Sequence, residues 1–211
     1  MEVALSLILA YLLGAIPFGY LFSRLRGVDI RKVGDRNVGS FNVFRHAGLI
    51  MGIATLVGDI GKGALAVVVA KAVCGEELVV FVAGGVAAAG HIWPVFLRFR
   101  GGRGAAVVIG VLLVLLPKEM LIAAGLAVMV LVITRNSIWA SATLFVPPPL
   151  LCWLFGEPVN LLVYSMVLPC LAGLAHWVTT RRLPPEAQEE AKVFRIASEP
   201  SGEQQDTDQS G

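Results

Sequence analysis

Residues 90–104 (GHIWPVFLRFRGGRG) have the composition most suited to binding an anion. Glycine leaves backbone N–H groups accessible, and the arginine guanidinium matches the oxygens of a phosphate. His91 stands at the start of this segment, where it either donates a hydrogen bond to a ligand or forms only a packing hydrogen bond between helices. The predicted anion ligands of this segment are Arg100, Gly101, Gly102, Arg103 and Gly104.

A second segment, residues 27–46 (GVDIRKVGDRNVGSFNVFRH), places cations between glycine, asparagine and serine. Two interpretations stay open from the residues alone. The segment is either a phosphate-binding loop or a basic loop that contacts anionic lipid headgroups. The candidates for a phosphate contact here are Asn37, Gly39, Ser40, Asn42 and Arg45.

Two further groups of polar residues lie in or beside apolar runs. Residues 176–183 (HWVTTRRL) follow the last run, and their two arginines can act simply as stop-transfer charges. Asp59 and Lys62 lie within a run, three residues apart and therefore on one helix face. Ionisable groups inside a membrane span are costly and are usually paired. We expect these two to form an ion pair that fixes helix packing.

The elements that carry these residues are long apolar runs. The 211-residue chain is 56% hydrophobic and 15% charged, whereas a soluble domain is about 25% charged. A membrane span needs about 20 apolar residues. The sequence therefore predicts an all-α, polytopic membrane protein with about seven transmembrane helices. The predicted spans are residues 3–22, 48–70, 78–97, 104–117, 119–134, 137–155 and 158–178.

The positions of lysine and arginine predict the orientation. Nearly all of them lie in alternate loops and after the last run, and such loops face the cytoplasm. We expect an external N-terminus, a cytoplasmic C-terminus and a cytoplasmic site in the plasma membrane. Residues 1–183 would form the membrane domain. In the polar tail, residues 184–211, we expect one short surface helix in the first half and disorder in the rest.

The fourth run is short. About 14 residues at about 1.5 Å each span about 21 Å, less than the hydrocarbon thickness. The glycine-rich loop before it is therefore expected below the membrane surface, where irregular backbone must be covered by protein or line a polar cavity. The sequence has no Ser–His–Asp arrangement and no metal-ligand spacing, and its three cysteines are read as packing residues. We expect no metal, no cofactor and no nucleic-acid partner.

Taken together, these motifs resemble the bacterial acyl-phosphate:glycerol-3-phosphate acyltransferases, the PlsY family. The resemblance covers the chain from about Leu12 to Leu183. Residues 14–45 are similar to the family's first motif, and residues 90–104 match its second closely. Residues 58–64 (GDIGKGA) and 176–183 are similar to two further family motifs.

The resemblance implies an enzyme that moves an acyl group from acyl phosphate to the 1-hydroxyl of glycerol 3-phosphate. It acts in the bilayer, and we expect a monomer. Arg103 and its neighbouring glycines would hold acyl phosphate, and His91 would polarise the acyl carbonyl or the hydroxyl. Arg45, Asn37 and Asn42 would hold glycerol 3-phosphate. From the motif at residues 176–183, the implied binding residues are His176, Thr179 and Arg182.

The chain departs from the family pattern at three single positions and lacks the Gly–Thr–Glu that usually follows the last motif. Asp35 stands where a serine is usual, Phe41 replaces a threonine and Thr179 replaces an asparagine. We expect Asp35 to be neutralised by Arg31, Lys32 or Arg36 and to orient the acceptor hydroxyl. Two other functions remain as alternatives: a transporter of a small phosphorylated anion, and a re-targeted or non-catalytic paralogue that binds lipid phosphate.

Overall fold

The computed structural model describes residues 1–181 and 183–192, and these form helices joined by short loops. Most helices follow the apolar runs of the sequence because a backbone in hydrocarbon must satisfy its own hydrogen bonds. In chain order the elements are α1 (Glu2–Ala15), α2 (Phe18–Arg24), η1 (Ile30–Lys32), α3 (Ser40–Ala47), α4 (Leu49–Val73), α5 (Glu77–Ile92), η2 (Val95–Leu97), α6 (Ala105–Leu115), α7 (Pro117–Thr134), α8 (Ser137–Phe145), α9 (Pro147–Phe155), α10 (Val159–Arg181) and α11 (Pro185–Lys192).

Five helical segments among the described residues are long and apolar enough to cross a membrane. They are Glu2–Arg24, Leu49–Val73, Glu77–Leu97, Pro117–Thr134 and Val159–Arg181. The remaining two predicted spans correspond to shorter apolar helices. One is α6, with 11 residues. The other is divided where α9 begins at Pro147, because proline cannot continue the hydrogen-bond ladder of α8.

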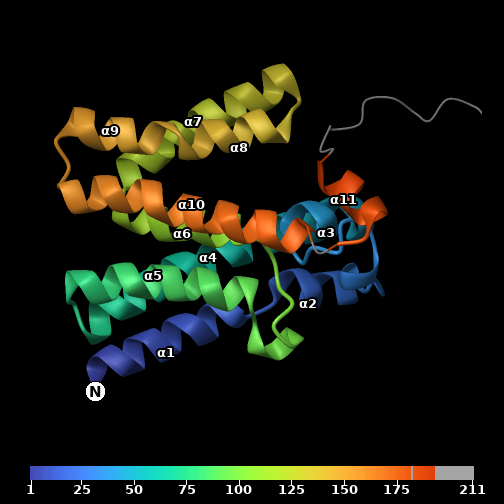
Figure 1. Ribbon diagram of the computed structural model, residues 1–211, viewed down its shortest axis with the longest axis horizontal. Helices are drawn as coiled ribbons and strands as arrows, with labels where there is room; N and C mark the ends of the chain where they lie inside the picture. The colour runs from blue at the N-terminus through green and yellow to red at the C-terminus, as the bar shows by residue number, and fades with distance from the viewer. Residues whose placement is uncertain (182, 193–211) are drawn as a thin grey trace, which may run out of the picture.

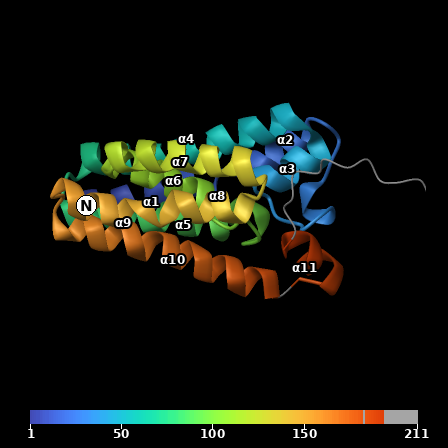
Figure 2. The same ribbon diagram turned by 90° about the horizontal axis from the view of Figure 1, so that it is seen from above.

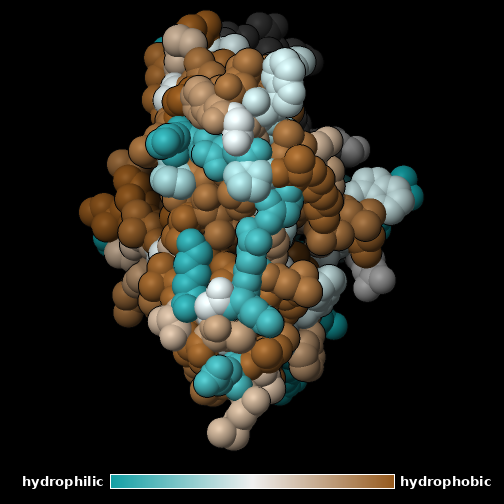
Figure 3. Space-filling model, turned by 90° about the vertical axis from the view of Figure 1, so that its left-hand side faces the viewer, coloured by the Kyte–Doolittle hydropathy of each residue, from teal (hydrophilic) through white to brown (hydrophobic). Residues whose placement is uncertain are grey.

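The helices form layers, with α1, α4 and α5 on one side and α7, α8 and α9 on the other (Figure 1). Helices α6 and α10 lie between them in this view. Figure 2 shows the same helices from above, with α10 along one edge. The loops before α3 and before α6 and the end of α10 gather at one end of the molecule, and the N-terminus lies at the opposite end. Figure 3 looks onto that opposite end, where hydrophilic side chains form isolated patches on a mostly hydrophobic surface.

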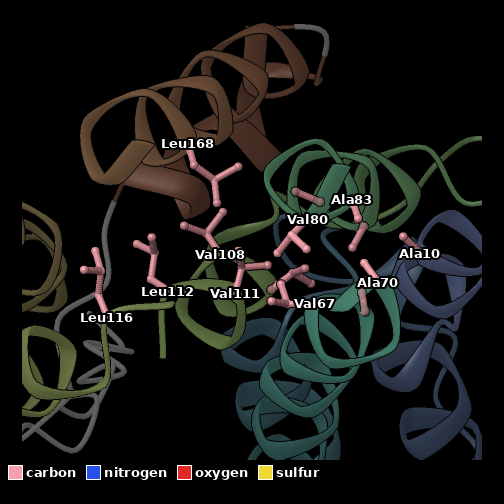
Figure 4. Close-up of a cluster of buried hydrophobic side chains, with 14 of the residues drawn as sticks. Ala10, Val67, Ala70, Val80, Ala83, Val108, Val111, Leu112, Leu116 and Leu168 are labelled. Carbon is pink, nitrogen blue, oxygen red and sulfur yellow. The ribbon is translucent and has the colours of Figure 1, made fainter. Parts of the chain in front are cut away.

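A continuous core of small and branched side chains joins α4, α5, α6 and α10 (Figure 4). Val67, Val108, Val111 and Leu112 are completely buried there. Helices α4 and α6 approach closely at Gly63 and Gly110, because a methyl group at either position would overlap a backbone carbonyl of the other helix. Small residues at helix contacts are the usual means of packing in membranes. This packing fixes the loop that precedes α6.

The polar tail begins with α11, so the prediction of a short helix after residue 184 is confirmed. The expected disorder of the remainder falls on residues 193–211, and the predicted ligand Arg182 also lies outside the described residues.

Candidate functional site

Asp35 and Arg103 form an ion pair between the first and second basic segments, with 2.7 Å between Oδ2 and the guanidinium. Both side chains are largely but not fully buried, at 13% and 16% exposed. The other carboxylate oxygen accepts a hydrogen bond from the backbone N–H of Asn37 at 3.1 Å. His176 on α10 lies within electrostatic range of both charges. The fold thus brings three residues from the three sequence motifs to one place.

This pairing corrects the prediction that Arg31, Lys32 or Arg36 neutralises Asp35. Arg31 instead makes two side-chain hydrogen bonds of 2.9 Å to Asp29, two residues before it. Arg31 also lies over the ring of Tyr20, with 4.4 Å to the ring centroid. The hydrogen bonds from Arg31 lower the pKa of the Asp29 carboxyl from 3.8 to about 2.

Asn42 holds the first basic segment together. Its side chain is 3% exposed, and its amide nitrogen donates to the backbone carbonyls of Ile30, Val33 and Asn37 at 3.2, 3.1 and 2.9 Å. The side-chain amide of Asn42, which was predicted to bind a phosphate, therefore makes its hydrogen bonds within the loop. Asn42 positions the loop that presents Asp35.

Gly101 and Gly102 were predicted to offer backbone N–H groups to an anion, but these groups are used within the protein. Their backbone N–H groups donate to the carbonyls of Ile92 and His91, both at 3.1 Å, and so are not exposed to a ligand. A methyl group at Gly102 would overlap the imidazole of His91. Glycine is required at these positions so that the loop can fold back over the end of α5. Gly104, which directly precedes α6, has φ +89, a backbone conformation in which L side chains are strained.

His91 lies beneath this loop and belongs to a buried charge cluster. Its Nδ1 is 3.6 Å from the Asp59 carboxylate, which is 2.8 Å from Nζ of Lys62. The ion pair predicted between Asp59 and Lys62 is therefore confirmed. Lys62 also donates to the carbonyl of Ile16 at 2.7 Å, where α1 ends before Pro17. Through these contacts the cluster joins the break between α1 and α2 to α4 and to His91 at the end of α5. His91 therefore lies beneath the glycine-rich loop.

The remaining predicted ligands are spread around the pair. Gly39 precedes α3, Ser40 begins it, and Arg45 lies exposed in its last turn. The hydroxyl of Thr179 donates to the carbonyls of Ala175 and His176, within its own helix, at 2.8 and 3.0 Å. In the described part of the chain, no group of three histidine, cysteine, aspartate or glutamate side chains is arranged to hold a metal ion.

A cleft of about 1090 Å³ is lined by residues that precede and follow Asp35 and Arg103 in the chain, although neither residue of the pair lines it. One wall comes from residues 29–36, a second from residues 92–101, and Thr179 and Leu183 close it. We call this space the basic cleft. Arg100 was predicted as an anion ligand and does line it. The sequence interpretation missed Asp29, Lys32 and Arg98 as lining residues, although the clustering of cations around them was a usable signal.

Comparison with known proteins identifies the relatives of this chain. The family model described as glycerol-3-phosphate acyltransferase matches residues 4–184. A glycerol-3-phosphate acyltransferase 4 of Dehalococcoides mccartyi is 42% identical over 179 residues, which are 84% of this chain and 97% of that protein. One of Geotalea daltonii is 38% identical over 82% of this chain and 90% of its own length.

Two crystal structures of PlsY, an integral membrane glycerol 3-phosphate acyltransferase, have a similar fold. The glycerol 3-phosphate form has a TM-score of 0.79 and 31% identity, and covers 93% of this chain and 96% of that one. The lysophosphatidic acid form has a TM-score of 0.78 and 30% identity, with the same coverage.

Proposed function

We propose a mechanism for this chain, which belongs to the glycerol-3-phosphate acyltransferase family. It is an integral membrane enzyme that acylates glycerol 3-phosphate in phospholipid synthesis. The transporter and the non-catalytic paralogue are therefore not retained. We propose the identity of the acyl donor, the roles of the site residues and the side of the membrane that these residues face.

The donor we propose is acyl phosphate, and the observation that carries the proposal is the partly exposed Arg103, which pairs with Asp35 where the first and second basic segments meet. Acyl phosphate is already activated, so the enzyme must mainly position two phosphate-bearing substrates and offset their charge. Arg103, Arg100 and the cations of the basic cleft are suited to that task. The chemistry of these side chains calls for no metal and no cofactor.

In the proposed step, the 1-hydroxyl oxygen of glycerol 3-phosphate attacks the acyl carbonyl carbon. A new ester C–O bond forms, the bond between the acyl carbon and the phosphate oxygen breaks, and inorganic phosphate leaves. Arg103 offsets the charge that grows on the leaving phosphate. Asp35 accepts the hydroxyl proton, which then passes to the phosphate. Arg45 and Ser40, at opposite ends of α3, are the proposed contacts for the phosphate of the acceptor.

Several residues change role relative to the sequence prediction. His91, Gly101 and Gly102 are proposed to position the loop that carries Arg103, because their polar groups are used in the buried cluster or in backbone hydrogen bonds. Asn37 contributes through the hydrogen bond from its backbone to Asp35. We propose a monomer, with residues 1–183 as the catalytic membrane domain.

The decisive assay is incubation of the purified protein with acyl phosphate and glycerol 3-phosphate. We expect phosphate release and formation of lysophosphatidic acid in equal amounts. An enzyme that acylates glycerol 3-phosphate only from an acyl thioester would contradict the proposed donor.

For the orientation, we propose seven crossings with the N-terminus outside and the site in the cytoplasm. The basic loops gather at one end of the molecule (Figure 1), and such loops face the cytoplasm. A membrane-impermeant thiol reagent applied outside intact cells should label native Cys74, which lies at the opposite end after α4. It should not label Ser40→Cys. Labelling of Ser40→Cys from outside would overturn the topology.

A further inference from the structure

The ion pair between Asp35 and Arg103 uses an N–H donor that a phosphate would also use. One carboxylate oxygen of Asp35 lies 2.7 Å from Nη1 of Arg103, and Asp35 is the ion-pair partner of Arg103 among the residues that the structure describes. A guanidinium binds carboxylate and phosphate oxygens through the same N–H groups. A phosphate that reaches this nitrogen must therefore take the place of the Asp35 oxygen.

The turn that carries Asp35 holds the carboxylate in one direction. Gly34 and Arg36, on either side of it, have φ of +58 and +55, and a non-glycine residue is uncommon in this region. A methyl group at Gly34 would overlap the side chain of Asn42, which holds the same loop together. Strained residues persist where surrounding contacts hold them, and they cluster at functional sites. The backbone is therefore shaped to present Asp35 to Arg103.

Asp35 has a second hydrogen bond that does not depend on Arg103. Its other carboxylate oxygen accepts from the backbone N–H of Asn37 at 3.1 Å. The side chains of Asp35 and Arg103 are 13% and 16% exposed, so water and a substrate phosphate have access to both charges. Separating the two does not leave a buried charge without a partner, which is the costly outcome for a fully buried pair. The carboxylate can therefore be exchanged for another anion.

We propose that this ion pair is exchanged during the reaction and that the exchange sets the order of substrate binding. The phosphate of the acyl donor displaces Asp35 from Arg103, and the released carboxylate oxygen then accepts a hydrogen bond from the 1-hydroxyl of glycerol 3-phosphate. As the ester C–O bond forms, the hydroxyl proton moves to Asp35 and then to the departing phosphate. Asp35 returns to Arg103 when the phosphate leaves. This inference rests on the proposed acyl phosphate donor and on the proposed role of Asp35.

An exchangeable carboxylate has two consequences. It competes with phosphate for Arg103, so it lowers the affinity of the enzyme for the donor and for inorganic phosphate. It also faces the acceptor hydroxyl only after the donor phosphate is bound, so the base becomes available when there is an acyl group to transfer. Both consequences depend on the negative charge of Asp35. The serine that is usual at this position in the family carries no charge and cannot form this ion pair.

The first test is inhibition by inorganic phosphate in Asp35→Asn. Asparagine has the shape of aspartate and an oxygen that can accept the hydrogen bond from the Asn37 backbone, but it carries no charge to bind Arg103. Formation of lysophosphatidic acid from palmitoyl phosphate and glycerol 3-phosphate is followed in detergent micelles. We expect the inhibition constant of phosphate against palmitoyl phosphate, and KM for palmitoyl phosphate, to fall about fivefold, the scale of a partly exposed ion pair. The kcat should fall as well, because the carboxylate is missing.

Asp29→Asn is the matched control. It removes an acid from the same basic segment, but Asp29 pairs with Arg31 and not with Arg103. Its inhibition constant for phosphate should equal that of the wild type. Asp35→Ser provides a second neutral variant if Asp35→Asn does not fold, and it should show the same fall in both constants. A comparable fall in Asp29→Asn would mean that any negative charge of the segment weakens phosphate binding, and it would overturn the inference.

The second test measures the coupling between the two substrates. Palmitoyl phosphonate, in which the acyl carbon is bonded directly to phosphorus, serves as a donor analogue that is not transferred. Binding of radiolabelled glycerol 3-phosphate is measured by equilibrium dialysis with and without the analogue. In the wild type the analogue should tighten the binding of glycerol 3-phosphate by about fivefold, because it releases Asp35. Asp35→Asn should show no such gain.

Phosphate inhibition that is unchanged or weaker in Asp35→Asn would overturn the inference, because the pair would then be structural. Acceptor binding that the analogue tightens equally in both proteins would also overturn it. Either result leaves the proposed donor intact. Failure of the wild-type enzyme to form lysophosphatidic acid from palmitoyl phosphate would instead refute the proposed donor, on which the inference rests.

Discussion

Asp59–Lys62 and Asp35–Arg103 join the same kinds of charge at nearly the same distance, 2.8 and 2.7 Å, in different surroundings. The side chains of the first pair are each 2% exposed, and those of the second are 16% and 13% exposed. A fully buried pair has no access to a ligand, and each charge depends on the other. A partly exposed pair can exchange one partner for a substrate phosphate. Burial therefore separates a structural pair from a reactive one.

The buried pair gives the largest expected effect. Asp59→Asn and Lys62→Met should each lower the free energy of unfolding by about 3–5 kcal/mol, because each leaves an uncompensated buried charge. The double variant should lose clearly less than the sum of the two. Denaturation of the purified proteins in detergent would measure all three. Losses that simply add would show that the two side chains act independently and would break the comparison.

Arg103→Ala tests the reactive pair. We expect kcat/KM to fall by at least about a hundredfold, which corresponds to about 2.7 kcal/mol of lost transition-state stabilisation. The thermal midpoint should change little, because the pair is partly exposed. Arg24→Ala, an exposed cation at the end of α2, is the matched control and should retain activity. Turnover of Arg103→Ala near the wild-type rate would remove Arg103 from the site.

Substitutions of Asp35 distinguish two interpretations of this residue. Either it orients the acceptor hydroxyl, or it marks an altered activity. If Asp35 orients the acceptor hydroxyl, Asp35→Ser should keep or modestly lower activity, because a hydroxyl can replace one hydrogen-bond acceptor. Asp35→Ala should lower it further, by roughly tenfold. Steady-state rates with glycerol 3-phosphate as the varied substrate would measure both. A wild-type enzyme that becomes active only as Asp35→Ser would refute this role.

The two regions also differ in how well the sequence predicts them. The apolar runs place the helices to within a few residues, since hydrophobicity and length determine what can lie in a bilayer. The pairing of Asp59 with Lys62 follows from their spacing on one helix. Asp35 and Arg103 lie on separate loops, and their meeting depends on how α4 packs against α6. Local periodicity contains no information on that packing.

The glycines of the second basic segment illustrate the same limit. Their number suggested backbone N–H groups free to bind phosphate. In the structure Gly101 and Gly102 are needed because the loop folds tightly over His91. Both interpretations predict glycine at these positions, and only the packing of the loop on α5 distinguishes them. The basic cleft likewise forms from segments far apart in the chain.

Asp29 and Arg31 form a third ion pair, which is more exposed than the other two. We expect its removal to have the smallest effect on stability. Its side chains are 16% and 39% exposed, so solvent screens the interaction and it should contribute about 1 kcal/mol or less. The pKa of Asp29 is lowered from 3.8 to about 2 in the folded protein, first by the side-chain hydrogen bonds from Arg31. Because the folded-state pKa is the lower one, the pair stabilises fully above pH 3.8 and loses this effect as the pH falls through about 2.

The measurement is the thermal midpoint of wild type and Asp29→Asn between neutral pH and the acid limit. At neutral pH the variant should be slightly less stable, and the difference should shrink as the pH falls through that range, because protonated aspartate and asparagine are both neutral. The buried cluster is identical in the two proteins, so its contribution cancels in the difference. A difference that stays constant down to the lowest pH would mean that Asp29 acts through its shape and not its charge. A difference of several kcal/mol would contradict the link between burial and pair strength on which the comparison of the other two pairs depends.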